Sequence, residues 1–214
     1  MKTEDLIVQL AGAAGPVRPL HRPGIRFLRW FAASVPFAVA FVILVGPRPD
    51  LANALGRRAF LASTSLMIAT SLIAAGAALA TGVPGRERAW AGALPPALAA
   101  VWAGLLLAWL APSGAPEPRL AVQSLHLLCI VEIAAIGLAP AIGLFAMLRR
   151  AAPLRPGWSA LLASLAGLSL GTAATEFLCP ISIPIHLVFG HALPAATLTV
   201  LAALAGRSRL AWLR

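Results

Sequence analysis

Charged residues are scarce in this chain. Only 11% of its 214 residues are Asp, Glu, Lys or Arg, whereas soluble domains carry about 25%. Because 60% of the residues are hydrophobic, the composition argues against a water-soluble domain. A bilayer-spanning helix needs roughly 20 apolar residues, so six spans would use about 120 and leave only short loops and tails. A separate catalytic domain of about 100 residues cannot fit beside them.

Cysteine is rare, and the common catalytic signatures are missing. The two cysteines, Cys129 and Cys179, are too few and too far apart for a disulfide scaffold or a Cys-x-x-Cys motif. The sequence contains no His-x-x-Glu-His, serine nucleophile elbow, phosphate-binding loop or zinc-finger spacing. Its first 26 residues lack the apolar core and cleavage site of a signal peptide. We therefore expect no enzyme activity, no cofactor and a retained N-terminal segment.

Six long apolar runs account for most of the chain, each close to the length of one membrane crossing. They cover residues 27–46, 59–82, 89–111, 125–148, 157–178 and 185–206, with Pro- and Gly-rich separators. This pattern predicts an all-α integral membrane protein with a six-helix bundle. Its parts are an N-terminal segment at 1–26, a transmembrane domain at 27–206 and a basic tail at 207–214. In the fifth run, Ala163, Gly167 and Gly171 repeat every four residues and predict a smooth face for close helix packing.

The positive charges indicate an orientation. The net charge is +10, but the basic residues lie mainly between the apolar runs, so we read them as topology signals and expect no direct contact with nucleic acid. With a cytoplasmic N-terminus, 13 of the 17 Lys and Arg residues fall on the inner side. The positive-inside rule therefore predicts that both termini are cytoplasmic. We also expect the apolar helices to be surrounded by the lipid bilayer.

A few ionisable residues lie inside or near the ends of the predicted spans. They are His126, Glu132, Glu176, His186 and His191. A carboxylate in lipid costs at least about 2–3 kcal/mol on insertion scales, so each such group is a candidate for function. The predicted orientation places all five, together with both cysteines, toward the external face.

The two thiols have several possible roles. His126, Cys129 and Glu132 recur every three residues and share one side of a helix. If the fourth and fifth helices are neighbours, Cys129 and Cys179 can form a disulfide or share a soft metal ion with imidazole and carboxylate help. The candidates for this sensor support are His126, Glu132, Glu176 and His186. In the alternative interpretation, the cysteines are small apolar fillers and the histidines make interfacial hydrogen bonds. The glutamates can then simply pair with histidines or with free backbone groups.

A different class of function is also compatible with these residues. In a small transporter or channel, Glu132, Glu176 and His191 would mark a polar site near the midplane. The predicted polar groups cluster toward one face of the membrane, which counts against a path across it.

The N-terminal segment predicts one short amphipathic helix. Glu4 and Asp5 lie in its first turn, and Leu6 and Leu10 follow at helical spacing. Because anionic inner-leaflet lipid would repel the acidic turn, the helix is a candidate for the groove of a partner protein. A frayed tail is the alternative.

Several sequence segments resemble one known family. They are Met1-Lys2-Thr3-Glu4-Asp5-Leu6, Pro16-Val17-Arg18-Pro19-Leu20, Gly46-Pro47-Arg48-Pro49-Asp50-Leu51 and the Cys179-Pro180 turn. Together they resemble the NrsF-type family (negative regulator of sigma F) of six-span bacterial anti-sigma factors. The resemblance covers essentially the whole chain, and the Arg-Pro-Asp-Leu loop and Cys-Pro turn are its most specific parts. It implies a cytoplasmic face that holds an extracytoplasmic-function (ECF) sigma factor at the inner membrane, away from RNA polymerase.

The resemblance also implies roles for individual residues. Cys129 and Cys179 would face outward, sense metal or oxidative stress and release the sigma factor, while Glu4, Asp5 and Leu6 would contribute to sigma binding. The chain departs from the family pattern at Leu178, where a His can precede the Cys. It departs again where Ile181-Ser182-Ile183 replace acidic residues. If those polar groups bind a metal in relatives, the departures favour oxidation or a softer ion as the signal here.

Overall fold

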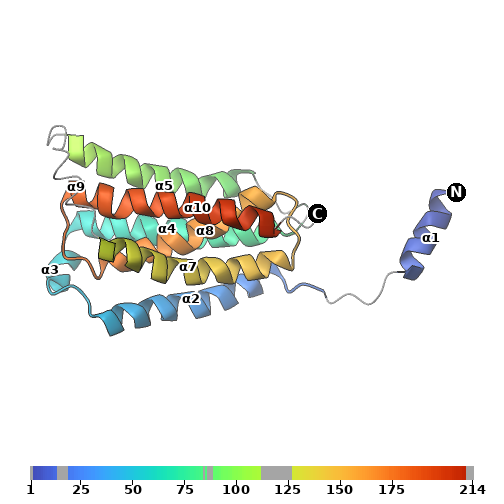
Figure 1. Cartoon of the computed structure of the whole chain (residues 1–214), viewed down its shortest axis with the longest axis horizontal. Coiled ribbons are helices and arrows are strands. Elements are labelled where there is room, and N and C mark those ends of the chain that lie inside the picture. Colours follow the sequence, from blue (N-terminus) through green and yellow to red (C-terminus); the bar gives the residue numbers. More distant parts are fainter. Residues whose placement is uncertain (1, 14–18, 84, 86–88, 112–126, 211–214) are drawn as a thin grey trace.

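The predicted all-helical architecture is confirmed. A computed structural model describes residues 2–13, 19–83, 85, 89–111 and 127–210, and this part of the chain contains no strand. It has six helices long and apolar enough to cross a membrane, arranged side by side in one bundle (Figure 1). They are α2 (Pro23–Val45), α4 (Arg58–Ala80), α5 (Ala89–Leu110), α7 (Leu127–Arg149), α8 (Pro156–Glu176) and the last span, Pro184–Leu210. The six spans begin and end within four residues of the predicted runs.

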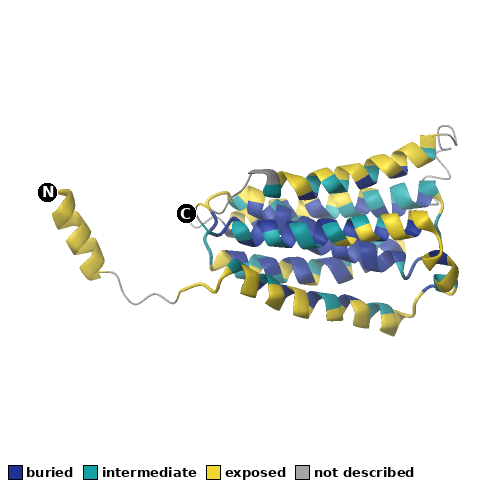
Figure 2. Ribbon diagram, turned by 180° about the vertical axis from the view of Figure 1, so that it is seen from behind, coloured by how far each residue is buried: buried dark blue, intermediate teal, exposed yellow. Residues whose placement is uncertain are grey.

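Helix α8 forms the centre of the bundle. It packs against α4, α7 and α10 (Leu193–Leu210), and all but one of its residues from Ser159 to Glu176 are buried (Figure 2). The predicted smooth face is confirmed. A Cβ atom added at Gly171 would lie 2.5 Å from the carbonyl oxygen of Ile133 and 2.8 Å from the amide nitrogen of Gly137. Because real Cβ atoms do not approach so closely, only glycine lets α7 and α8 come this near.

Helix α2 lies at the periphery and has a small buried face. Two side chains attach it to α7 through backbone carbonyls. Trp30 donates its indole N–H to the carbonyl oxygen of Pro140 at 3.0 Å, and Arg26 donates to that of Met147 at 2.6 Å. The other side of α2 exposes large apolar residues such as Leu44, as expected for a lipid-facing helix.

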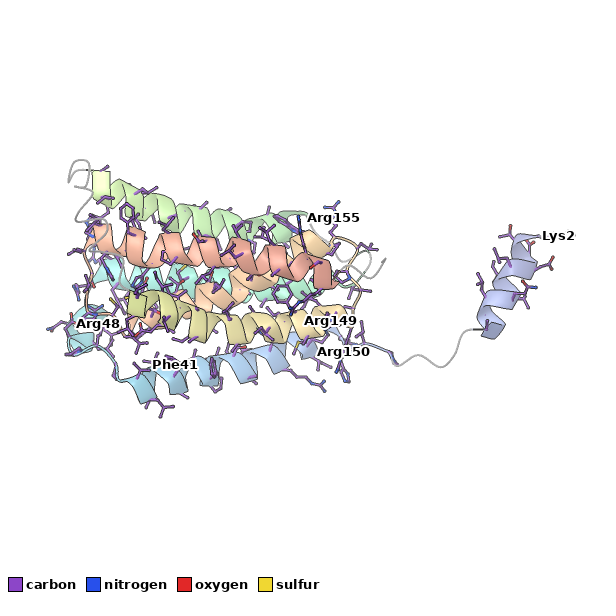
Figure 3. All side chains as sticks on the ribbon, in the orientation of Figure 1. Lys2, Phe41, Arg48, Arg149, Arg150 and Arg155 are labelled. Atoms are coloured by element: carbon purple, nitrogen blue, oxygen red, sulfur yellow. The ribbon has the colours of Figure 1, made fainter. Side chains whose placement is uncertain are left out.

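Arginine side chains mark the two ends of the bundle. Figure 3 shows Arg149, Arg150 and Arg155 at one end and Arg48 at the other, and we call these the Arg149 end and the Arg48 end. The predicted N-terminal helix is present as α1 (Thr3–Ala13), with Glu4 and Asp5 in its first turn. All residues of α1 are exposed, and it lies apart from the bundle, beyond the Arg149 end (Figure 1).

Two local features were not predicted. A short helix, α3 (Leu51–Leu55), follows α2 at the Arg48 end. The last span is not uniform, because a π-helical turn (Leu187–Ala192) separates α9 (Pro184–His186) from α10. Pro194 has no N–H to donate to the carbonyl of Gly190, so the α-type hydrogen bond is missing where the helix widens.

Candidate metal centre

Two thiols and two imidazoles meet in the buried interior of the Arg48 end. The ligand atoms of Cys129, Cys179, His186 and His191 all lie within 4.8 Å of one another. The two Sγ atoms are 3.7 Å apart. The Nε2 atom of His186 lies 3.2 Å from the Sγ of Cys179 and 3.8 Å from the Sγ of Cys129. The predicted proximity of the two cysteines is therefore confirmed, and both are free thiols.

Three segments position these side chains. Cys129 lies in the first turn of α7, and Cys179 lies in the loop directly after α8, so the close packing of these helices brings the sulfurs together. His186 ends α9, and His191 lies in the π-helical turn. In an α-helix, residues five apart point roughly 140° away from each other. In a π-helix the hydrogen bonds connect i to i+5, so such residues lie nearly above one another. The two rings accordingly pack edge to face, with centroids 5.2 Å apart.

The four donors suit a tetrahedral metal ion. Zn–S bonds of about 2.3 Å and Zn–N bonds of about 2.0–2.1 Å imply sulfur–sulfur separations of about 3.8 Å and sulfur–nitrogen separations of about 3.6 Å. The Sγ–Sγ separation of 3.7 Å and the separation of 3.8 Å between His186 Nε2 and Cys129 Sγ are close to these values, whereas His186 Nε2 and Cys179 Sγ, at 3.2 Å, are closer than a shared ion would place them. Both ring nitrogens of His191 are buried without a hydrogen-bond partner among the described residues. Since an unsatisfied buried polar group costs about 1–3 kcal/mol, a metal ligand role would relieve this cost.

The environment of Cys179 favours a thiolate. Hydrogen bonds from Cys129 and His186 lower the pKa of the Cys179 thiol, and they outweigh burial, which raises it. Thiolate is the form that binds metals and attacks electrophiles.

A second polar cluster lies beside the thiols and was not predicted. Ser63 and Thr64 of α4 each donate a hydroxyl hydrogen bond of 2.5 Å to the carboxylate of Glu176. Trp102 of α5 donates its indole N–H to the Ser63 oxygen at 2.8 Å. Sequence reasoning had offered the histidines or free backbone groups as partners for Glu176. The only available signal was a pair of adjacent hydroxyl residues in an apolar run, which is too common to assign a partner.

Arg48 connects the loop after α2 to the loop after α8. Its side chain is buried, and it donates to the carbonyl oxygen of Pro180 at 2.9 Å and to the Ser182 hydroxyl at 3.0 Å. Its backbone N–H donates to the carbonyl oxygen of Phe177 at 2.8 Å. The segment that carries Cys179 is therefore held on both sides of the cysteine. The sequence marks Arg48 as part of a loop typical of the family, but it does not predict these contacts.

The charge of Arg48 is balanced at the surface. Asp50 accepts a hydrogen bond of 2.6 Å from Arg48 and one of 2.9 Å from Arg57. The hydrogen bond from Arg48 and the charges of both arginines hold the pKa of Asp50 below its ordinary value. The Arg-Pro-Asp part of this loop thus forms one ion-paired unit over the Cys-Pro turn.

The other predicted site residues have different positions. Glu132 is buried on α7, but it makes no hydrogen bond or ion pair with a described residue. His126 lies outside the described residues. The proposed sigma-binding residues Glu4, Asp5, Leu6 and Leu10 are exposed on α1, and their role stays a prediction.

The structure also shows the surroundings of the residues at which this chain differs from the family pattern. Leu178 packs in a small apolar cluster with Ile136, and Ser182 binds Arg48. Neither contributes to the four-donor cluster, whose two nitrogen donors come from further along the chain, at His186 and His191.

In the part of the chain that the structure describes, six helices are long and apolar enough to span a membrane, and a buried thiol and imidazole cluster lies at one end of their bundle. These features define the class as a multi-pass membrane protein with a candidate metal or redox centre. The sequence model of the family described as "Negative regulator of sigma F" matches residues 10–212, and the chain belongs to this family. No curated protein and no solved structure gives a significant match to it. The family description makes a sigma factor the expected partner. The two motifs most specific to the resemblance, the Arg48 loop and the Cys-Pro turn, are hydrogen-bonded to each other.

Proposed function

We propose that this chain is an anti-sigma factor of the bacterial inner membrane that holds an ECF sigma factor on the cytoplasmic face. We propose further that it releases the partner when Cys129, Cys179, His186 and His191 bind a thiophilic divalent cation such as Zn²⁺. The observation that carries the sensing step is the convergence of two sulfur and two nitrogen donors within 4.8 Å of one another, with the two sulfurs 3.7 Å apart as in a tetrahedral site.

The distribution of charge supports the orientation. With both termini in the cytoplasm, the Arg149 end is internal and the Arg48 end, which contains the thiols, is external. The labelled arginines at the Arg149 end agree with the positive-inside rule (Figure 3). The sensing groups would then face the compartment from which a metal signal arrives.

Transmission of the signal follows from where the donors lie. Bringing the four ligand atoms onto one ion fixes the start of α7, the loop after α8 and the π-helical turn relative to one another. Helices α7 and α10 continue from these points to the Arg149 end. A ligand can shift a conformational equilibrium only through its different affinities for the two states. The sigma factor is released if it binds the arrangement of α7 and α10 that the metal disfavours.

The exposed apolar side chains of α1 supply a surface for the sigma factor. Leu6 and Leu10 lie one turn apart and are exposed, and the acidic first turn precedes them. A helix docked in a groove of the partner would use these leucines as anchors.

The experiment uses the full-length chain in nanodiscs and first screens the ECF sigma factors of the same bacterium for the one that binds it. The complex is isolated, Zn²⁺ is added, and released sigma factor is measured. We expect release from the wild type and at least tenfold less release from Cys129→Ser, Cys179→Ser and His191→Asn. The matched control, His21→Asn, changes an exposed histidine outside the cluster and should behave as the wild type.

The possible outcomes are distinct. Absence of any complex with the sigma factor would refute the anti-sigma function. Equal release from all variants would refute the cluster as the trigger. Release by a thiol oxidant but not by Zn²⁺, lost in both serine variants, would keep the thiol trigger and overturn metal ligation.

A further inference from the structure

A large cavity lies between α4 and α5 at the Arg48 end. Its volume is about 940 Å³, at the upper end of the range for small-molecule sites. Its lining is mainly apolar, with side chains of α4 and α5 such as Phe60, Leu66, Trp102, Leu105 and Leu106. Along α4 it extends from Arg57 to Ala69, which is about 18 Å of helix and comparable to the depth of one leaflet.

The charges that line this cavity are unequally distributed. Inside it, Glu176 is held by Ser63 and Thr64, and Arg48 is held by Asp50 and the loop after α8. At the end of α4 that would lie at the membrane surface, Arg57 and Arg58 are exposed. Arg57 shares Asp50, whereas Arg58 makes no ion pair with a described residue. The cavity therefore has a cationic rim at interfacial depth above an apolar interior.

The back wall carries one unsatisfied polar group. His191 lines the cavity, is fully buried and has both ring nitrogens without a hydrogen-bond partner among the described residues. With one ring nitrogen directed to a metal ion, the other can still donate to one carbonyl oxygen of a molecule that enters between α4 and α5.

We propose that this cavity binds one anionic phospholipid. Arg57 and Arg58 bind its phosphate, and an acyl chain lies against Leu66, Trp102 and Leu105. Basic pockets between transmembrane helices recognise lipid headgroups in this way, and each arginine near the surface contributes enough for about a fivefold change in affinity. A neutral lipid or a cationic molecule lacks the negative charge that Arg57 and Arg58 attract. This lipid site goes beyond the proposed anti-sigma function and does not depend on it.

The test is native mass spectrometry of the full-length chain in detergent. Phosphatidylglycerol and phosphatidylcholine with identical acyl chains are the probes. We expect one phosphatidylglycerol to be retained in preference to phosphatidylcholine. Arg58→Gln should lower its affinity about fivefold, and Arg57→Gln combined with Arg58→Gln should lower it further. Ala69→Trp, which fills the inner cavity, should weaken both lipids. Arg207→Gln, at an exposed arginine of the other end, is the matched control.

A second measurement locates the lipid. Trp102 is buried and lines the cavity, so brominated acyl chains should quench its fluorescence most strongly when they lie inside. The fluorescence difference between wild type and Trp102→Phe should be quenched by brominated phosphatidylglycerol. Equal retention of both lipids by wild type, unchanged retention in the double arginine variant, or an unquenched Trp102 component would each overturn the proposal. Circular dichroism of every variant confirms that the helices are intact.

Discussion

Helices α8 and α2 differ in how far they are buried and in the contacts that hold them in the bundle. In α8, 78% of the spanning segment is buried inside the protein, yet it has the lowest mean hydropathy of the six spans. In α2, 17% is buried and the mean hydropathy is higher. The difference follows from the solvent, because lipid is as apolar as leucine and gives no hydrophobic gain for burying large side chains. The central helix is therefore held by close contact of small residues, and the peripheral helix by a few hydrogen bonds.

The strongest test of this contrast is a larger side chain in α8. Gly171→Leu places atoms where the backbone of α7 already lies, and we expect the free energy of unfolding to fall by at least about 3 kcal/mol. Ala40→Leu, at an exposed position of α2, should change it by less than about 0.5 kcal/mol. Unfolding in mixed micelles with a denaturing detergent measures both. If the two substitutions have equal effects, the contrast between the helices is wrong.

A smaller effect is expected at Arg48, which joins the loop after α2 to the loop after α8. Arg48→Lys keeps the charge, but a lysine cannot form the fork that reaches Asp50, Pro180 and Ser182 together. We expect a loss of about 2–3 kcal/mol in the free energy of unfolding and weaker binding of Co²⁺, followed by its thiolate charge-transfer absorption. Arg57→Lys is the control, since Arg57 is exposed. Full Co²⁺ affinity in Arg48→Lys would show that the loop around Cys179 holds its position without this arginine.

The smallest effect concerns the attachment of α2 itself. Trp30→Phe removes the hydrogen bond to the Pro140 carbonyl and retains most of the ring packing. We expect a loss of about 1 kcal/mol in the same unfolding assay. Trp158→Phe, at a partly exposed tryptophan with no such bond among the described contacts, should have less effect. Equal losses would mean that α2 is held by packing, as α8 is.

The sequence was informative where periodicity and length decide the outcome. Run length located the six spans, and the four-residue spacing of Gly167 and Gly171 identified the close-packing face. The proximity of Cys129 and Cys179 followed from placing neighbouring helices antiparallel. These are consequences of helix geometry and need no knowledge of distant contacts.

Other features of the site depend on contacts between distant segments, and a local sequence pattern does not predict such contacts. The sequence places His191 toward the external face but does not place it with the thiols, and an α-helical register would point it away from His186. The hydroxyl groups that satisfy Glu176 come from α4, 112 residues away for Thr64. The sequence assigns Arg48 to a loop outside the spans, and nothing local shows that it is buried by the loop that it binds.

The π-helical turn at Leu187–Ala192 stores one extra residue in the last span. If this turn became α-helical, the part of α10 that follows it would move along the helix axis by about 1.5 Å and rotate about that axis by about 100°. Gly206 packs against the ring of Phe145 on α7, so such a rotation would replace that contact with a different face of α10. The exposed Arg207 and Arg209 would then point in new directions at the Arg149 end. A one-residue change of register beside His191 is thus geometrically sufficient to alter the surface presented at the opposite end of the bundle.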